Sequence, residues 1–346
     1  MLSRISISRL AAVFLFILAS SATSAQSALE QVEKDVQRLF ETAKNSVVQI
    51  KAIRQNAVPP LAVGTGFFIN DQGLILTSSE VVNDCAENDI QVIWGMRKLN
   101  AKRIGFDTRT NLGLIKIPAN GTPALKFCDS ENVRVGAMVV GVGFPLNSAL
   151  CPEVGNVSSV DLGQIMKFFA TSHIRSTVRV VEGQAGSPLL NTKGEVVGMI
   201  VAADTDGSHS YALPVSAIKK VQPDLEKYSQ PRYGFVGIGI NELTVDGKGN
   251  PLAEPKVIVE RVYSGTSAEQ AGVKKGDVVL KINGLKVSQA ADVMNATYYL
   301  RVDDKITVTA RNAAGQEKDF VIRIGPRPVA PAKPRAGDGI PVSQKQ

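Results

Sequence analysis

Residues 182–191 read EGQAGSPLLN, a glycine-rich stretch that precedes the apolar segment VVGMIV at residues 196–201. Glycines mark tight turns because they adopt backbone conformations that other residues avoid. The apolar segment is short and rich in β-branched residues, which is typical of a buried β-strand. The stretch therefore predicts a tight turn that leads into a strand.

The same pattern extends on both sides of this stretch, from residue 46 to about residue 221. Short β-branched runs alternate there with Gly, Asn and Asp turns, and a break at residues 118–131 divides them into two sets. The first set comprises residues 47–50, 66–69, 73–77, 90–93 and 112–117, and the second comprises residues 137–142, 156–160, 174–177 and 211–215. Many short strands at this spacing predict an all-β domain of two barrels.

The N-terminal residues have the pattern of a secretory signal peptide. Arg4 and Arg9 precede an apolar run at residues 10–19, and small residues follow this run up to Ala25. The apolar run is too short for an ordinary membrane span. We therefore expect a signal peptide at residues 1–25, a periplasmic mature protein and no stable membrane span after cleavage. The alternative is an uncleaved N-terminal anchor.

Further segments flank the β-rich region, which we place at residues 46–227. Residues 28–45 carry apolar side chains at helical spacing and predict an amphipathic helix. We place a second domain at residues 228–326, and residues 229–232 at its start have the composition of a linker. This domain is predicted to contain a helix at 288–300 and a terminal hairpin at 305–324. The tail at residues 327–346 is rich in Pro, Ala, Lys and Gly, and this composition predicts disorder.

Composition narrows the classes of function. The chain has 346 residues and a net charge of +7, without a basic run interleaved with aromatic residues, so we expect no nucleic-acid partner. Three cysteines, Cys85, Cys128 and Cys151, permit one disulfide, and the sequence leaves its pairing open. Their spacing matches no metal motif, so we expect neither a metal nor another cofactor.

Several motifs, taken in order, resemble those of one protease family. They are GTGFFI at 64–69, DQGLILT at 71–77, DTRTNLGLIKI at 107–117, GFP at 143–145 and the turn at 182–191. Together they resemble the HtrA (Deg) family, secreted trypsin-like serine proteases that carry a PDZ domain. The resemblance implies an all-β double barrel of the trypsin type followed by an α+β PDZ domain.

All three catalytic positions depart from the family pattern. Glu80 stands where the family has the base His, Asn111 where it has Asp, and Ala185 where it has the nucleophilic Ser. Ala185 has no atom that attacks a carbonyl, and a carboxylate is a weaker base than imidazole. The backbone positions of the oxyanion hole, Gly183 and Ala185, need no particular side chain. The resemblance thus predicts a pseudoprotease without an intact catalytic residue.

Two alternatives compete with this interpretation. One is a serine endopeptidase with an altered triad, in which Ser187 would attack; however, neither His173 nor His209 occupies a position suited to activate it. The other is a metal-binding protein that uses Glu80 and Asn111, although two oxygen ligands are fewer than a hard cation requires.

The second domain keeps the motif that holds a peptide carboxylate in the family. The carboxylate-binding residues implied by the resemblance are Tyr233, Gly234, Phe235, Val236 and Gly237. A bound C-terminal peptide would extend the sheet there as an added strand. We therefore expect a scaffold, adaptor or regulator of protein quality control in the cell envelope, which binds unfolded or C-terminal peptide segments of other proteins. The resemblance also implies a homotrimer.

Overall fold

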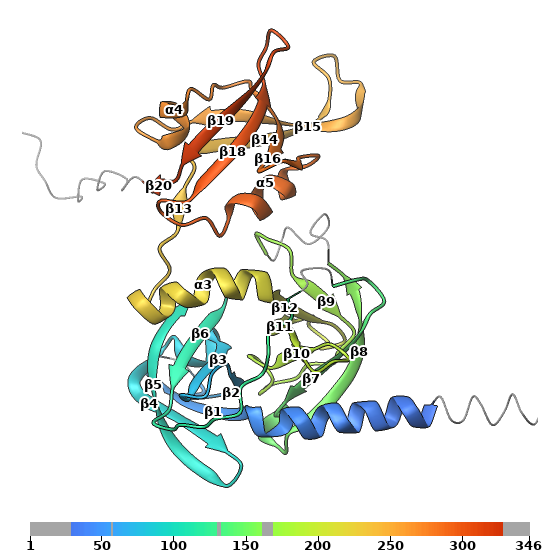
Figure 1. Ribbon diagram of the computed structural model, residues 1–346, viewed down its shortest axis with the longest axis vertical. Helices are drawn as coiled ribbons and strands as arrows, with labels where there is room; N and C mark the ends of the chain where they lie inside the picture. The colour runs from blue at the N-terminus through green and yellow to red at the C-terminus, as the bar shows by residue number, and fades with distance from the viewer. Residues whose placement is uncertain (1–28, 57, 130–132, 161–168, 328–346) are drawn as a thin grey trace, which may run out of the picture. The chain divides into compact units, whose positions relative to one another are not determined.

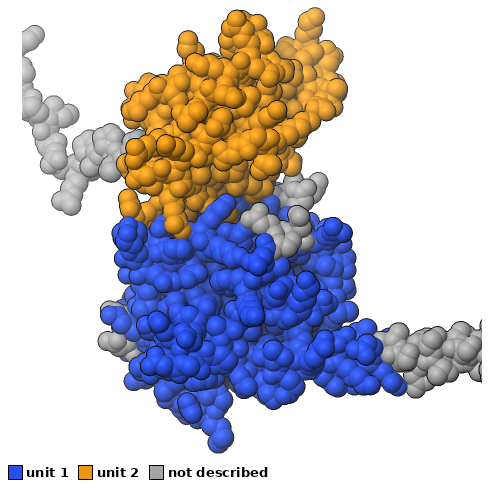
Figure 2. Space-filling model, in the orientation of Figure 1, with its two compact units in different colours: residues 1–231 blue, residues 232–346 orange. Residues whose placement is uncertain are grey.

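The computed structural model describes residues 29–56, 58–129, 133–160 and 169–327. The chain divides between Pro231 and Arg232 into two compact units, coloured blue and orange in Figure 2. The signal peptide expected at residues 1–25 and all but the first residue of the tail expected at 327–346 lie outside the described residues.

The first unit begins with the expected amphipathic helix. Residues 29–43 are helical and lead through the 3-10 turn η1 (Lys44–Ser46) into the first strand. Leu39 and Ala43 are buried, whereas Leu29 is 73% exposed. The apolar stripe therefore packs on its own domain only at the C-terminal end of the helix. Within the part of the chain that the structure describes, no helix is both long enough and apolar enough to cross a membrane.

Two closed β-barrels make up most of the first unit, which confirms the predicted double-barrel fold (Figure 1). The first barrel has the strand order β1-β2-β3-β6-β5-β4. Its strands are β1 (Val47–Arg54), β2 (Leu61–Phe68), β3 (Leu74–Ser78), β4 (Cys85–Trp94), β5 (Arg97–Asp107) and β6 (Leu112–Lys116). Strand β3 is buried at every position and pairs with β2 on one side and with β6 on the other. A short helix, α2 (Ser79–Val82), follows it directly.

The second barrel has the strand order β10-β11-β12-β9-β8-β7. Its strands are β7 (Met138–Gly143), β8 (Cys151–Ser159), β9 (Ile174–Ser176), β10 (Pro188–Leu190), β11 (Val196–Ala203) and β12 (Ser210–Pro214). A 3-10 turn, η2 (Pro145–Asn147), follows β7. Branched aliphatic side chains such as Val139, Ile174 and Ile200 fill this barrel, so each barrel has its own hydrophobic core.

Helix α3 (Val215–Tyr228) ends the first unit and packs against strands of both barrels, as Figure 1 shows. Its buried face includes Ile218, Val221 and Leu225 at helical spacing. Neither this helix nor strand β5 was predicted from the sequence. Helix α3 contains Pro223, a residue that argues against a helix, and β5 carries charged residues at many of its positions.

The second unit is a mixed domain of strands and two short helices, as expected for a PDZ domain. Its main sheet has the order β14-β15-β16-β18-β19, with β17 paired to β16, and β13 pairs separately with β20. The strands are β13 (Gly234–Phe235), β14 (Ile238–Val245), β15 (Pro251–Val262), β16 (Val278–Ile282), β17 (Leu285–Lys286), β18 (Lys305–Arg311), β19 (Glu317–Arg323) and β20 (Gly325–Pro326), and the helices are α4 (Ser267–Ala271) and α5 (Ala290–Thr297). Strand β14 lies at the edge of the sheet, with one edge free of a partner strand among the described residues.

Candidate functional site

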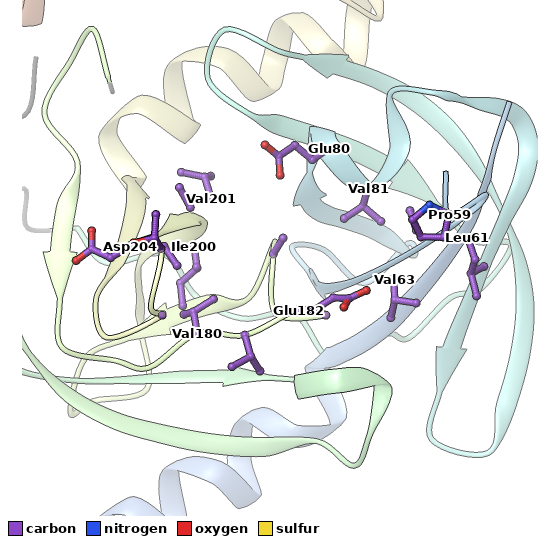
Figure 3. Close-up of a pocket in the computed structure, with 18 of the residues that line it drawn as sticks. Pro59, Leu61, Val63, Glu80, Val81, Val180, Glu182, Ile200, Val201 and Asp204 are labelled. Carbon is purple, nitrogen blue, oxygen red and sulfur yellow. The ribbon is translucent and has the colours of Figure 1, made fainter. Parts of the chain in front are cut away.

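A cleft of about 590 Å³ lies in the first unit, and both barrels contribute to its lining. The first barrel supplies residues of β2 and α2, and the second supplies residues 180–183, Ala185 and residues 200–207. Figure 3 shows Glu80 and Val81 on one side and Val180 and Ile200 on the other. Glu80 and Ala185 both line this cleft, and Asn111 lies next to Glu80 through the hydrogen bonds described below. The fold thus brings together the three positions that the sequence singled out.

Glu80 occupies the first turn of α2. Ser78 caps this helix, and the Glu80 N–H group donates to Ser78 Oγ at 3.3 Å and to Asn111 Oδ1 at 3.1 Å. A carboxylate is favourable at a helix N-terminus. The side chain of Glu80 is exposed and has no hydrogen bond or ion pair to the described residues. Its carboxylate is therefore available to a molecule in the cleft.

Asn111 is fully engaged in hydrogen bonds. Its Oδ1 accepts from Ser78 Oγ at 2.9 Å, from Ser79 Oγ at 2.7 Å and from the Glu80 N–H group. Its Nδ2 donates to the carbonyl oxygen of Val201 on β11, at 3.0 Å. A carboxylate has no proton to donate at neutral pH and could not make the bond to Val201. The amide of Asn111 therefore ties the start of α2 in the first barrel to a strand of the second barrel.

The turn at residues 182–187 contains two backbone N–H groups that donate no hydrogen bond within the described residues. The N–H groups of Gly183 and Ala185 have no acceptor among the described residues. The preceding carbonyl groups, of Glu182 and Gln184, accept from Leu146 N–H at 2.6 Å and from Ser187 N–H at 3.0 Å. In a trans peptide the N–H group points opposite to the C=O group, so both donors are directed away from these partners. Both residues line the cleft, at the oxyanion-hole positions that the sequence predicts.

Thr65 on β2 fixes the conformation of this turn. Its hydroxyl donates to Gly183 O at 2.8 Å and accepts from Phe144 N–H at 3.1 Å, and its N–H group donates to Ala185 O at 2.9 Å. Gly186 has φ +90°, and a Cβ there would lie 2.2 Å from Thr65 O, so only glycine fits. Thr65 and Phe144 belong to the GTGFFI and GFP motifs, but their role in holding this turn was not predicted from the sequence.

Leu146 contributes strain to the same arrangement. It has φ 50°, a left-handed conformation that is costly for a branched apolar residue, and its side chain is 69% exposed. Its N–H group holds the Glu182 carbonyl, as described above. Gln184 also stabilises the turn, because its Oε1 accepts from Val181 N–H at 2.8 Å. The contacts of Leu146 and Gln184 thus hold the turn in an ordered conformation.

Ser187 does not face the cleft. It is 1% exposed, its Oγ has no hydrogen-bond partner in the part of the chain that the structure describes, and a Cβ on Gly143 would come within 2.2 Å of that oxygen. A nucleophile must reach its substrate and a base. The burial of Ser187 therefore leaves it unsuited to replace the missing nucleophile.

Neither histidine forms a catalytic pair. His173 is buried, stacks on Phe169 at 3.9 Å between ring centroids, and contacts Thr171 O through Nδ1 at 2.9 Å. This burial lowers the pKa of His173 to about 4.

His209 lies beside Asp204 and Ser208, but the same ring nitrogen, Nδ1, contacts Asp204 Oδ2 at 3.2 Å and Ser208 Oγ at 3.0 Å. A relay from Ser to His to Asp needs both ring nitrogens. Asp204 is occupied in addition by Tyr211, whose hydroxyl donates to it at 2.7 Å and lowers its pKa. These contacts tie His209 and Tyr211 to Asp204, and Ser208 to His209.

The described residues contain no group of three or more His, Cys, Asp or Glu side chains arranged to hold a metal ion. Cys85, Cys128 and Cys151 are all free thiols in the structure, so none of the three pairings left open by the sequence is formed. Burial raises the pKa of Cys85 and of Cys151, which keeps both in the less reactive thiol form.

The expected peptide site of the second unit lies at the start of the edge strand β14. The N–H groups of Val236 and Gly237 have no acceptor among the described residues. Gly234 is engaged, because its N–H group donates to Leu300 O at 2.7 Å, and the ring of Phe235 packs against Tyr263. Gly237 has φ +95° and a Cβ there would lie 2.2 Å from Thr266. Of the five expected residues, Val236 and Gly237 therefore supply the available donors in this loop.

Comparison with known proteins matches each unit to a known domain. Residues 64–199 match the trypsin-like peptidase domain, and residues 234–322 match the PDZ domain. A protein of Pseudomonas fulva named "Probable periplasmic serine endoprotease DegP-like" is 28% identical over 290 residues, which cover 82% of this chain and 60% of the relative. The protein of that name in Rhizobium meliloti is 30% identical over 290 residues, which cover 81% of this chain and 56% of the relative. The chain thus spans a little over half the length of these relatives.

Solved structures share the fold of both units. The HtrA-type protease AlgW with a tripeptide has a TM-score of 0.71 and 22% identity, over 85% of this chain and 98% of that one. A serine endoprotease from Yersinia pestis has a TM-score of 0.61 and 24% identity, over 84% of this chain and 97% of that one.

Proposed function

This chain is related to the HtrA/Deg proteases through both of its domains, and we propose that it has kept their peptide binding while it has lost their proteolytic chemistry. In this proposal it acts as a scaffold, adaptor or regulator that binds C-terminal or unfolded peptide segments. The periplasmic relatives support a location in the periplasm, and the expected signal peptide at residues 1–25 would direct it there.

The observation that carries the proposal is the combined change at Glu80, Asn111 and Ala185. Ala185 offers only a methyl group to the cleft, and Asn111 uses both ends of its amide elsewhere. Loss of a complete triad costs on the order of 10⁶ in turnover, and the oxyanion hole and binding retain about 10³–10⁴ over water. The two free backbone donors at Gly183 and Ala185 can therefore hold a carbonyl group without cleaving its peptide bond.

The second unit supports the binding role. Strand β14 is an edge strand, and the unengaged N–H groups of Val236 and Gly237 lie where that strand begins. An extended peptide can add to such an edge by main-chain hydrogen bonds, with its terminal carboxylate on the loop donors. We propose that this loop and edge bind the C-terminus of a partner protein.

The assembly proposed from the family resemblance is a homotrimer. The helix at residues 29–43 has exposed apolar side chains, Leu29 and Val32, that a neighbouring subunit could cover. Sedimentation of the mature protein tests this part of the proposal, and a monomer at micromolar concentration would contradict it.

The experiment that tests the function combines two assays on the mature chain. Casein or a denatured protein is incubated with it, and products are followed by mass spectrometry; we expect no cleavage. Binding of a labelled peptide with an apolar C-terminal residue is followed by anisotropy, with the same peptide amidated at its C-terminus as control. We expect only the free carboxylate to bind the second unit. Cleavage that disappears on substitution of one named residue, or equal binding of both peptides, would contradict the proposal.

A second candidate is a serine endopeptidase with an altered triad, which the names of the relatives favour. It requires Ser187 or another hydroxyl to act as nucleophile. A fluorophosphonate probe tests it directly, since the probe labels an activated serine. We expect no labelling, because Ser187 is buried and has no partner for its hydroxyl.

The metal-binding alternative at Glu80 and Asn111 is disfavoured by the hydrogen bonds of Asn111. Its Oδ1 already accepts from three donors and is not free for a cation. Isothermal titration of Ca²⁺ or Zn²⁺ into the mature chain and into Glu80→Ala tests it, and we expect no heat that depends on Glu80.

A further inference from the structure

We propose that the cleft between the two barrels selects, among internal segments of unfolded polypeptides, those that carry Lys or Arg. The site is separate from the C-terminal peptide site of the second unit. That the segment is held uncleaved rests on the proposed loss of proteolysis.

Two backbone N–H groups of the cleft are available to a ligand oxygen. Gly183 is buried, Ala185 is half-buried, and both line the cleft with N–H groups that lack an acceptor among the described residues. A buried donor without a partner is costly, so a ligand oxygen placed there is favourable. The contacts of Thr65 and Leu146 hold the donors in place before any ligand arrives. The cleft is thus prepared to receive a carbonyl oxygen.

The volume and the apolar lining of the cleft suit a long side chain. Its volume of about 590 Å³ lies within the range of binding pockets. Val180, Ile200 and Val201 form an apolar part of its lining (Figure 3). The aliphatic stem of a long side chain can pack on such a surface while its charged end stays in water.

The charge of the cleft determines the class of ligand. Among the described residues, the lining contains four carboxylates, Glu80, Glu182, Asp204 and Asp206, and one guanidinium, Arg54. Asp204 is already paired with Arg175 at 3.3 Å. Glu80 and Glu182 are exposed and have no side-chain hydrogen bond or ion pair to the rest of the described chain. They therefore attract a cation and repel an anion.

The negative charge of the cleft discriminates between two ligands that the backbone donors alone would bind, a C-terminal carboxylate and an internal peptide carbonyl. A C-terminal carboxylate would bring a further negative charge into an acidic cleft, whereas the carbonyl of an internal peptide bond is neutral. A Lys or Arg side chain on the same segment would face Glu80 or Glu182. The chain as a whole is basic, with a net charge of +7, so the acidic character is local to the cleft.

The test uses the full mature chain and a ten-residue peptide that contains Leu, Val, Lys and Arg. The peptide is labelled at its N-terminus and amidated at its C-terminus, so that it lacks the carboxylate that the second unit requires. A matched peptide has Glu in place of Lys and Arg. Binding is followed by fluorescence anisotropy at about 50 mM salt, where charge effects are clear.

We expect the basic peptide to bind and the acidic peptide to bind at least tenfold more weakly. Glu80→Gln and Glu182→Gln should each weaken the basic peptide by about two- to fivefold, and the double variant by about tenfold. Glu260→Gln removes an exposed carboxylate of the second unit and should have no effect.

Three results would overturn the proposal: no binding of the basic peptide, equal binding of the acidic peptide, or equal binding by the double variant. Cleavage of the bound peptide, seen by mass spectrometry, would overturn its claim that the segment is held intact. A peptide with a free apolar C-terminus, measured on the same variants, reports the second unit independently. Its failure to bind would count against the C-terminal peptide site alone.

Discussion

Ala185→Ser places a serine hydroxyl at the position of the nucleophile and changes nothing else. It tests whether the other residues of the cleft can activate that hydroxyl. Ala185 lines the cleft and is half-buried, so one added oxygen has room, and we expect the free energy of unfolding to change by no more than about 0.5 kcal/mol. The backbone donors at Gly183 and Ala185 stay in place. Any remaining defect in hydrolysis is then caused by the absence of the base and of the residue that orients it.

The size of that defect follows from the neighbours of residue 185. No imidazole lies in position to accept the hydroxyl proton, because His173 is buried against Phe169 and His209 is bound to Asp204. Loss of the base alone costs about as much as loss of the complete triad, on the order of 10⁶ in turnover, or about 8 kcal/mol in the barrier. Ala185→Ser should therefore show no cleavage above background.

The assay is hydrolysis of fluorescent casein, run beside labelling by a fluorophosphonate probe. The matched counterpart is the triple variant Glu80→His, Asn111→Asp and Ala185→Ser, for which we expect hydrolysis and labelling at least about tenfold above the single variant. Hydrolysis by Ala185→Ser alone would show that Glu80 or another group acts as a base, and it would refute this reasoning.

Three further predictions concern stability and binding. Burial keeps the pKa of His173 at about 4, below its ordinary 6.5, so between these pH values the unfolded chain binds a proton that the folded chain does not. The unfolding free energy should fall as pH falls through this window, by up to about 3 kcal/mol; urea denaturation should show a shallower pH slope for His173→Asn, and equal slopes would contradict the assignment. Gly237→Ala should abolish binding of a free C-terminal peptide while the cleft still binds the amidated basic peptide, because a Cβ at φ +95° would overlap Thr266. Loss of both activities, measured by anisotropy, would argue against independent sites. Leu146→Gly should raise the unfolding free energy by up to about 1 kcal/mol, since glycine relieves the left-handed strain at φ 50° and the replaced side chain is 69% exposed; a clear loss in thermal denaturation would contradict the strain.

The sequence predicted the two barrels, the PDZ-like domain and the three altered positions. These features depend on local patterns, namely β-branched runs between turn residues and motifs in a fixed order. The contacts that decide the chemistry of the cleft join distant segments, as Thr65 does with Gly183, and such contacts depend on how the barrels close. The burial of Ser187 also depends on that closure, since the residue lies against Gly143 of another strand.

The charge of the cleft was not predicted for a related reason. Glu80 was identified as an altered catalytic position, but Glu182, Asp204 and Asp206 have no special pattern along the chain. Only the fold shows that these carboxylates share one cavity with two free backbone donors.

The bond from Asn111 Nδ2 to Val201 O bears on whether a Ser-His-Asp triad could be built into this cleft one position at a time. An Asp at this position would direct a carboxylate oxygen at a carbonyl oxygen, and the lost bond and the unsatisfied acceptor would cost about 1–3 kcal/mol. A cost of that size is a substantial fraction of the stability of an ordinary domain. Reversal at this single position would therefore weaken the fold without any gain in turnover, because the base and the nucleophile would still be absent. The amide that joins the barrels thus opposes a change to Asp at position 111 unless Glu80 and Ala185 have also changed.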